Sequence, residues 1–133
     1  FNLLIGNSDA HGKNISFNID RSGISVSPFY DLVNIMIYPT LDNELAMAIG
    51  DEFNPENIYA SQLADFCSEN NINKKLVSKQ LKSLCRKVKN SIENILVPTE
   101  KKLEQKFFTE LKVNILKRVS HYHDIADEIP KIS

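Results

Sequence analysis

The stretch NLLIGNSDAHGKNISF, residues 2–17, places many polar side chains between two apolar runs. Gly, Asn and Asp are common in turns because of their backbone preferences and their local hydrogen bonds. This loop also contains a histidine and a lysine, and it places Asp9 and Asn14 with four residues between them. No turn requires those additions. We therefore expect the loop to hold a ligand or a reacting group.

A short β-hairpin is expected directly after this loop. Residues 15–19 and residues 24–27 alternate apolar and polar side chains, and the cluster DRSG lies between them. Such a pattern is typical of two strands joined by a tight turn. Pro28 ends the second strand, and Asp31 follows three residues later. The hairpin is therefore predicted to bring Asp9, Asn14 and Asp31 together at one of its ends.

Residues 51–133 have the periodicity of amphipathic helices. The first helix is expected from Asn54-Pro55 to about residue 70, the second after an N-cap at Asn73, and the third after Pro98-Thr99. The side chains predicted to be buried are Ile58, Leu63, Phe66 and Cys67 in the first helix, Leu76, Val77, Leu81, Leu84, Val88, Ile92 and Ile95 in the second, and Leu103, Phe107, Leu111, Ile115, Val119 and Tyr122 in the third.

These patterns predict a mainly α protein with a small β-hairpin. With 133 residues, of which 42% are hydrophobic and 25% charged, the chain is long enough for one domain with its own core. We expect a single domain over residues 1–133, in which residues 1–50 carry the chemistry and residues 51–133 form a helical subdomain.

Charge and cysteine content exclude several classes of protein. The formal net charge of −1 gives no general attraction to nucleic acid or to an anionic membrane, so any such binding must be local. Cys67 and Cys85 belong to no C-x-x-C motif or Cys/His cluster, so we expect reduced core thiols in a cytoplasmic protein. No apolar run approaches the roughly 20 residues of a membrane span.

The order and spacing of three polar residues fit phosphoryl transfer. In protein kinases an Asp orients the attacking hydroxyl, an Asn after four intervening residues binds Mg²⁺, and a later Asp also binds metal. Mg²⁺ prefers oxygen ligands. Asp9, Asn14 and Asp31 follow that order. The alternative is that these side chains only satisfy backbone groups of a loop.

At this point a family resemblance becomes specific. GNSDAHGKNISF (residues 6–17) together with SPFYDLV (residues 27–33) resembles the HipA family of bacterial serine/threonine protein kinases, the toxins of toxin–antitoxin pairs. LAMAIG (residues 45–50) and NIYASQLADF (residues 57–66) are similar to the same family's C-terminal subdomain. The resemblance implies the C-lobe of a protein-kinase/phosphatidylinositol-kinase-like fold.

The resemblance also implies roles for individual residues. Asp9 would be the catalytic base, and Asn14 and Asp31 would bind Mg²⁺ and thereby ATP. His11 and Lys13 would contact the phosphates of ATP, although His11 has the alternative of bracing the loop. Asn7 and Ser8 would shape the loop. Phe29 and Tyr30 would either pack over the nucleotide or anchor the metal-binding segment.

A complete kinase also needs a glycine-rich nucleotide loop and a phosphate-binding lysine in its N-lobe. The four glycines of this chain do not cluster, and the chain begins at Phe1 without an initiator Met. We therefore expect a C-lobe without its N-lobe, which alone is inactive or nearly so. The complete protein would transfer the γ-phosphoryl group of ATP to a protein Ser or Thr, for example on an aminoacyl-tRNA synthetase. The implied partners are that substrate, the N-lobe, and an antitoxin through which DNA is contacted indirectly.

Two other functions compete with this interpretation. A non-catalytic binding fragment would engage an antitoxin or a substrate and would bind no Mg·ATP. A lipid kinase would also use an Asp-x-His-x-x-Asn loop, but this chain has Phe-Tyr-Asp-Leu where Asp-Phe-Gly is expected, and nothing suggests a membrane surface.

Two further features of the helical part have open interpretations. Seven basic residues and no acidic residue lie between positions 74 and 89. They form either a solvated helix face or a patch for an acidic partner or nucleic acid. The pair His121 and His123 resembles a metal site but has no third ligand in the sequence, so we interpret it as helix surface.

Overall fold

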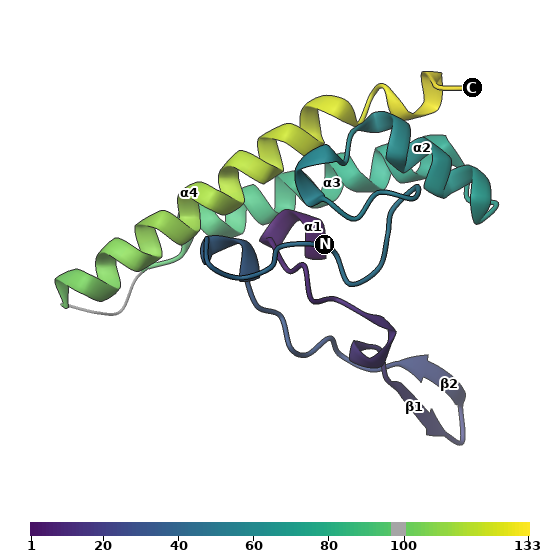
Figure 1. The fold of residues 1–133 in the computed structure, drawn as a ribbon. Helices are drawn as coiled ribbons and strands as arrows, with labels where there is room; N and C mark the ends of the chain where they lie inside the picture. The colour runs from purple at the N-terminus through teal and green to yellow at the C-terminus, as the bar shows by residue number, and fades with distance from the viewer. Residues whose placement is uncertain (97–100) are drawn as a thin grey trace.

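The computed structural model describes residues 1–96 and 101–133 (Figure 1). Its elements are α1 (Asn2–Ile5), β1 (Phe17–Asp20), β2 (Gly23–Val26), α2 (Ala60–Glu69), α3 (Lys74–Asn94) and α4 (Lys102–Ile125), with short 3₁₀ turns at Gly12–Asn14, Ile35–Ile37, Pro55–Asn57 and Ile129–Lys131. The described part of the chain is thus mainly helical with one two-stranded antiparallel sheet, as predicted. No helix in it is long and apolar enough to cross a membrane.

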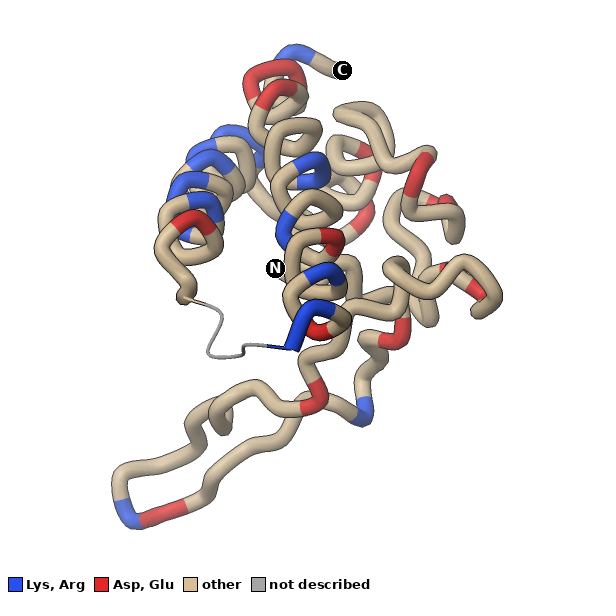
Figure 2. The backbone as a smooth tube through the Cα atoms, turned by 90° about the vertical axis from the view of Figure 1, so that its left-hand side faces the viewer, with Lys and Arg blue, Asp and Glu red and all other residues tan. Residues whose placement is uncertain are grey.

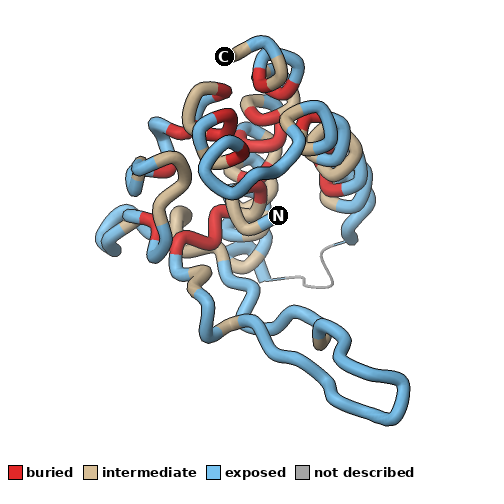
Figure 3. The backbone as a smooth tube through the Cα atoms, turned by 90° about the vertical axis from the view of Figure 1, so that its right-hand side faces the viewer, coloured by how far each residue is buried: buried red, intermediate tan, exposed pale blue. Residues whose placement is uncertain are grey.

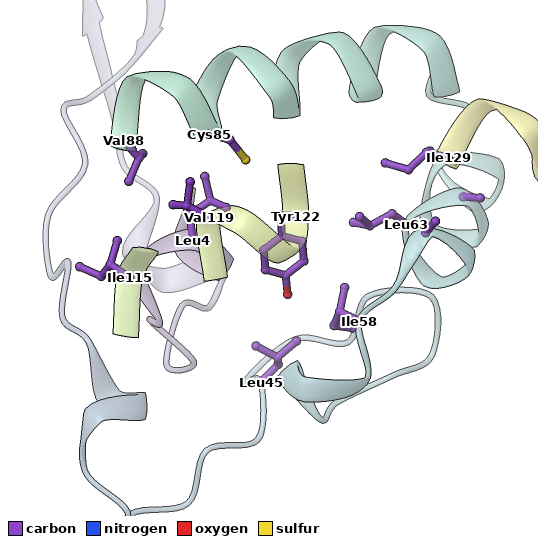
Figure 4. Close-up of a cluster of buried hydrophobic side chains, with 12 residues drawn as sticks. Leu4, Leu45, Ile58, Leu63, Cys85, Val88, Ile115, Val119, Tyr122 and Ile129 are labelled. Atoms are coloured by element: carbon purple, nitrogen blue, oxygen red, sulfur yellow. The ribbon is translucent and has the colours of Figure 1, made fainter. Parts of the chain in front are cut away.

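The core lies between the two long helices. α3 and α4 run side by side, and α1 and α2 pack against them (Figure 1). The largest fully buried side chains come from all four helices, from the segment before α2 and from the turn after α4. They are Tyr122, Leu4, Ile58, Ile129, Cys67 and Cys85, and Figure 4 shows all of them except Cys67. Both cysteines are free thiols, as predicted, and burial raises the pKa of each.

Local capping chemistry explains where two helical segments begin. The side chain of Asn73 accepts a hydrogen bond from the backbone N–H of Leu76 at 3.0 Å, so α3 starts at the predicted position. Asn54 caps only the 3₁₀ turn Pro55–Asn57, and the prediction that α2 begins there is wrong. The backbone of Ile58 is extended, which places its side chain in the core before α2 starts at Ala60.

Four side chains predicted to be buried are exposed instead. The exposed fraction is 52% for Leu76, 46% for Ile95, 81% for Leu103 and 37% for Phe107. The first half of α4 extends beyond α1 and α2, so these two helices do not cover its apolar stripe there (Figure 1). The ring of Phe107 contacts the rings of Tyr38 and Phe108. The predicted helix boundary at Pro98-Thr99 lies outside the described residues.

The hairpin projects away from the helices, and its residues are exposed (Figure 3). β1 pairs with β2 so that Phe17 faces Val26 and Ile19 faces Ile24. These four apolar side chains share one face because side chains alternate along a strand. The alternating pattern thus predicts the hairpin correctly, but its apolar face has no described neighbour.

Candidate functional site

The loop that follows α1 begins with a residue, Gly6, whose backbone is in the left-handed helical conformation. Gly6 ends α1 with φ 75° and ψ 29°, a conformation that glycine adopts without steric cost. Its carbonyl accepts a hydrogen bond from the backbone N–H of Ile35 at 3.0 Å. A Cβ atom at Gly6 would lie 2.7 Å from Oδ1 of Asn34. The start of this loop therefore lies against the segment that follows Asp31.

Asn14 and Asp31 meet at the base of the hairpin. Residues Gly12–Asn14 form a 3₁₀ turn, and Oδ1 of Asn14 accepts a hydrogen bond from the backbone N–H of His11 at 3.0 Å. Nδ2 of Asn14 donates to Oδ2 of Asp31 at 3.2 Å. The returning strand thus brings these two predicted site residues into contact.

Asp31 has an unusual backbone conformation. Its φ is 57°, a left-handed value that is uncommon for residues other than glycine, although Asp and Asn adopt it more often than the rest. Its carbonyl accepts a hydrogen bond from Nδ2 of Asn7 at 3.3 Å, and the same amide group lies 3.3 Å from Oδ1 of Asn2. Asn7 is only 4% exposed, so its side chain is a buried link between α1 and the Asp31 backbone.

Tyr30 anchors the loop through its hydroxyl group. The hydroxyl donates to the carbonyl of Lys13 at 2.7 Å and lies 3.3 Å from Oγ of Ser16. This contact corresponds to the anchoring role, one of the two roles that the sequence left open for Tyr30. Phe29 is 63% exposed.

The other predicted site residues are close in sequence but are not linked through their side chains. Asp9 and Lys13 are exposed, and in the described part of the chain their side chains make no hydrogen bond or ion pair. His11 is half-buried, and its Nδ1 atom has no hydrogen-bond partner among the described residues. His11 braces the loop through its backbone N–H and not through its ring.

The side chains of Asn14 and Asp31 fit a magnesium ion whose remaining ligands are phosphates and water. The Asn14 carbonyl oxygen has a second lone pair, and the Asp31 carboxylate accepts one hydrogen bond among the described residues, so both retain capacity for a cation. Within residues 1–96 and 101–133, no group of three or more His, Cys, Asp and Glu side chains could hold a metal. Mg²⁺ is usually bound through one or two protein oxygens together with phosphates and water, which suits this pair.

The candidate site is an open surface. A cavity of about 530 Å³ lies between α3 and α4, where it is lined by residues such as Cys85, Arg86 and Val119. None of its lining residues belongs to the loop or to the Asp31 segment. Asp9, Asn14 and Asp31 therefore do not line that cavity.

Arg118 positions the loop indirectly, and the sequence analysis missed it. Its side chain is 7% exposed, its Nε donates to the carbonyl of Leu3 at 2.5 Å, and its Nη1 lies 3.4 Å from Oε1 of Glu56. Because Leu3 belongs to α1, this hydrogen bond ties α1 to α4. The signal was present in the sequence, because Arg118 interrupts the apolar stripe that contains Ile115 and Tyr122.

The two histidines at the end of α4 have different surroundings. His121 is half-buried, its Nε2 lies 2.9 Å from the carbonyl of Ile58, and its ring packs on Tyr59 and Tyr122. His123 lies 3.7 Å from Asp124. The prediction that both histidines are plain helix surface is wrong for His121, which packs against the segment before α2.

Comparison with known proteins points to one family. Residues 1–95 match the family model of the HipA-like C-terminal domain. The chain is 39% identical over 131 residues to the serine/threonine-protein kinase toxin HipA of Shewanella oneidensis, which covers 97% of this chain and 30% of that protein. It is 33% identical over 99 residues to Y4mE of Sinorhizobium fredii, which covers 74% of this chain and 24% of that protein.

A solved structure supports the same relationship. HipA of Shewanella oneidensis, in a complex with HipB and operator DNA, matches with a TM-score of 0.93 and 37% identity over 99% of this chain and 32% of that chain. The matches thus span between 24% and 32% of the length of these relatives. From the family model, the identity and the shared fold together, we conclude that the chain belongs to the HipA-like C-terminal domain family.

Proposed function

We propose that this chain is the C-lobe of a serine/threonine protein kinase toxin, which transfers the γ-phosphoryl group of Mg·ATP to a Ser or Thr of a protein. The observation that carries the proposal is the contact between Asn14 and Asp31 at the base of the hairpin, beside the loop that contains Asp9. The name of the Shewanella relative supports the reaction class. An aminoacyl-tRNA synthetase remains the substrate we expect from the family resemblance.

Each residue of the site has a distinct role in this proposal. Asn14 and Asp31 would hold Mg²⁺, which when bound offsets negative charge on the phosphates of ATP. The Asp9 carboxylate has no described partner, so it is free to orient the attacking hydroxyl and to accept its proton. The exposed ammonium group of Lys13 is free to contact a phosphate. The Nδ1 atom of His11 has no hydrogen-bond partner among the described residues, so it is the atom of this side chain that would contact a phosphate.

The hairpin would connect this lobe to the rest of a kinase. Its apolar face, formed by Phe17, Ile19, Ile24 and Val26, is between 55% and 79% exposed. We propose that it packs against an N-lobe of the kind present in the longer relatives. Phosphate-positioning groups supply much of the catalysis of phosphoryl transfer, so the 133 residues alone should be inactive or nearly so.

Labelled phosphate transfer tests the proposal. We would compare the 133-residue chain, the chain extended to the length of its relatives, and the extended protein with Asp31→Ala or Asp9→Asn, using γ-labelled Mg·ATP and a bacterial lysate. Asp42→Ala is a matched control, because Asp42 is an exposed loop acid that accepts a hydrogen bond only from the backbone of Glu44. We expect the extended protein and its Asp42→Ala variant to label lysate proteins, and we expect no labelling by the 133-residue chain or by the Asp31 and Asp9 variants.

Two results would contradict the kinase proposal. Full labelling by the Asp31 variant would show that the metal-binding role is wrong. An extended protein that labels nothing and binds no Mg·ATP, yet binds an antitoxin tightly, would favour the non-catalytic binding function instead.

A second proposal concerns DNA and rests on the surface of α3. Figure 2 shows basic residues repeated along one side of this helix. Lys75, Lys79, Lys82, Arg86 and Lys89 follow one another at steps of three and four residues, which places them on a single face. The stripe is about 21 Å long at the α-helical rise of about 1.5 Å per residue.

The stripe borders a concave surface. A cavity of about 500 Å³ is lined by Lys75, Ser78, Lys79, Lys82, Arg86, Asp127 and Pro130. Asp127 offsets part of the charge, because its carboxylate lies 2.7 Å from Nζ of Lys82. We propose that the remaining cations contact DNA phosphates within an assembly with an antitoxin, as the complex in which the Shewanella HipA was solved suggests.

Salt dependence tests this second proposal. For the protein bound to its antitoxin, the logarithm of the affinity for a duplex DNA of about 20 base pairs should fall with the logarithm of the salt concentration, with a slope near −0.9 per phosphate contact. Lys75→Gln with Lys79→Gln should reduce that slope by about two, whereas Lys117→Gln, an exposed cation of α4, should leave it unchanged. An unchanged slope in the double variant would identify the stripe as a solvated face.

A further inference from the structure

The hydrogen bond of Tyr30 joins the residues that precede the two proposed metal ligands. Its hydroxyl donates at 2.7 Å to the carbonyl of Lys13, which is followed by Asn14, while Tyr30 itself is followed by Asp31. The Asn14 and Asp31 side chains touch at 3.2 Å immediately beyond this bond. The two contacts are thus consecutive links between the same two segments.

We propose that Tyr30 is a positioning residue that holds Asn14 and Asp31 at the spacing needed to bind one Mg²⁺. This inference rests on the proposed function and adds the residue that sets the geometry of its metal site. The need for such a link follows from the surroundings of both ligands. Asp31 is exposed and Asn14 is half-buried, and Asp31 has a left-handed backbone with φ 57°, a conformation that aspartate adopts less readily than glycine, so contacts from neighbouring segments help to hold it.

The remaining contacts between the two segments are a backbone hydrogen bond from the Ser27 N–H to the Ser16 carbonyl at 2.9 Å, at the start of the hairpin, and two longer contacts. The Asn7 amide reaches the Asp31 carbonyl at 3.3 Å, and the Ser16 hydroxyl reaches Tyr30 at 3.3 Å. Outer groups that orient metal ligands commonly change metal affinity about 10- to 100-fold when they are removed. Tyr30 acts through a backbone carbonyl, so we expect the lower end of that range.

A single oxygen atom distinguishes the test variant from the wild type. Tyr30→Phe removes the hydroxyl and keeps the ring, and Tyr30 is 47% exposed, so loss of the fold is not expected. Tyr38→Phe is a matched control. Tyr38 is also 47% exposed, and its hydroxyl makes no hydrogen bond within the residues that the structure describes.

Paramagnetic Mn²⁺, used as the probe for Mg²⁺, reports the site without any activity assay. We would titrate Mn²⁺ into the isotope-labelled 133-residue chain and follow the broadening of the backbone amide signals of Asn14 and Asp31. Tyr30→Phe should need about tenfold more Mn²⁺ for half-maximal broadening, while Tyr38→Phe should match the wild type. Amide shifts outside residues 9–34 should stay unchanged, which separates a local effect from unfolding.

The possible outcomes separate this inference from the proposed function. Equal Mn²⁺ dependence in Tyr30→Phe and the wild type would overturn the role of Tyr30 and leave the metal site in place. A wild-type chain whose Asn14 and Asp31 signals do not broaden at any millimolar Mn²⁺ concentration would overturn both the metal site and the role of Tyr30.

Discussion

The side-chain nitrogen Nδ2 of Asn14 lies 3.2 Å from Oδ2 of Asp31, although the two residues are 17 positions apart. The hairpin between them makes this contact possible, because β1 and β2 are antiparallel and return the chain to its starting point. An amide and a carboxylate can meet in this way without a metal, whereas two carboxylates repel each other.

The substitution Asn14→Asp replaces the amide–carboxylate contact with two carboxylates and so tests whether the pair can bind a cation. Two carboxylates at this position should lower the free energy of unfolding by less than about 1 kcal/mol, because the pair is exposed and screened. Millimolar Mg²⁺ should restore the loss, and KCl of equal ionic strength should restore less of it. Thermal unfolding with each salt measures the difference. Equal recovery in both salts would contradict a metal site at this pair.

Gly6→Ala should destabilise the protein through both backbone strain and a clash. Gly6 has φ 75°, and the added methyl group would lie 2.7 Å from Oδ1 of Asn34. We expect a loss of more than about 1 kcal/mol in a denaturant titration. Gly12→Ala is the control, because Gly12 has no atom within 4 Å of an added Cβ and no left-handed φ. Equal stability of the two variants would show that the Gly6 turn does not need glycine.

Arg118→Met should be strongly destabilising. The substitution keeps an apolar stem but leaves the Leu3 carbonyl without its 2.5 Å hydrogen bond from a buried guanidinium. Loss of a buried hydrogen-bond partner costs about 1–3 kcal/mol. Glu56→Gln should cost less than about 1 kcal/mol, because Glu56 is 64% exposed. Chemical denaturation of both variants tests this order, and a larger effect at Glu56 would reverse our interpretation of the contact.

Tyr122 should make stability depend on pH in the alkaline range. Burial raises the pKa of Tyr122 to about 12 from its ordinary value of 10.0. The unfolded chain therefore loses this proton first as the pH rises. The stabilising contribution is complete below pH 10 and is lost between pH 10 and about 12, at up to about 1.4 kcal/mol per pH unit. Unfolding of the wild type and of Tyr122→Phe at several pH values should differ in slope only there. Identical slopes would contradict the raised pKa.

The two cysteines should resist modification in the folded protein. Cys67 and Cys85 are fully buried free thiols, and burial raises the pKa of both, which lowers the thiolate fraction near neutral pH. A thiol reagent at pH 8 should label both only after denaturant is added. Rapid labelling of either thiol under native conditions would show that its surroundings open frequently.

Local features of the fold were predictable because a few neighbouring residues determine them. The turn cluster DRSG defines the hairpin, and the Asn73 side chain caps α3 through a residue only three positions away. Asn54 shows the limit of such reasoning. It does form a cap, but the extended backbone of Ile58 ends the turn because the core takes up that side chain.

Burial was less predictable than secondary structure. Leu103 continues the apolar stripe of α4 as regularly as Ile115 does, yet Leu103 is 81% exposed and Ile115 is 6% exposed. Periodicity shows which face of a helix is apolar, but not how far along the helix another element covers that face. Arg118 is the opposite case. This charged residue lies in the apolar stripe and is buried, because its guanidinium group donates hydrogen bonds to the Leu3 carbonyl and the Glu56 carboxylate.

The sequence by itself determined the helical class, the hairpin and the order of Asp9, Asn14 and Asp31, because these depend on residue types at short spacing. Only the tertiary structure decided that Asn14 touches Asp31, that Tyr30 bonds to Lys13, and that Arg118 ties α4 to α1 across 115 positions. Those contacts depend on how distant segments pack against one another, and no short-range pattern in a chain specifies that packing.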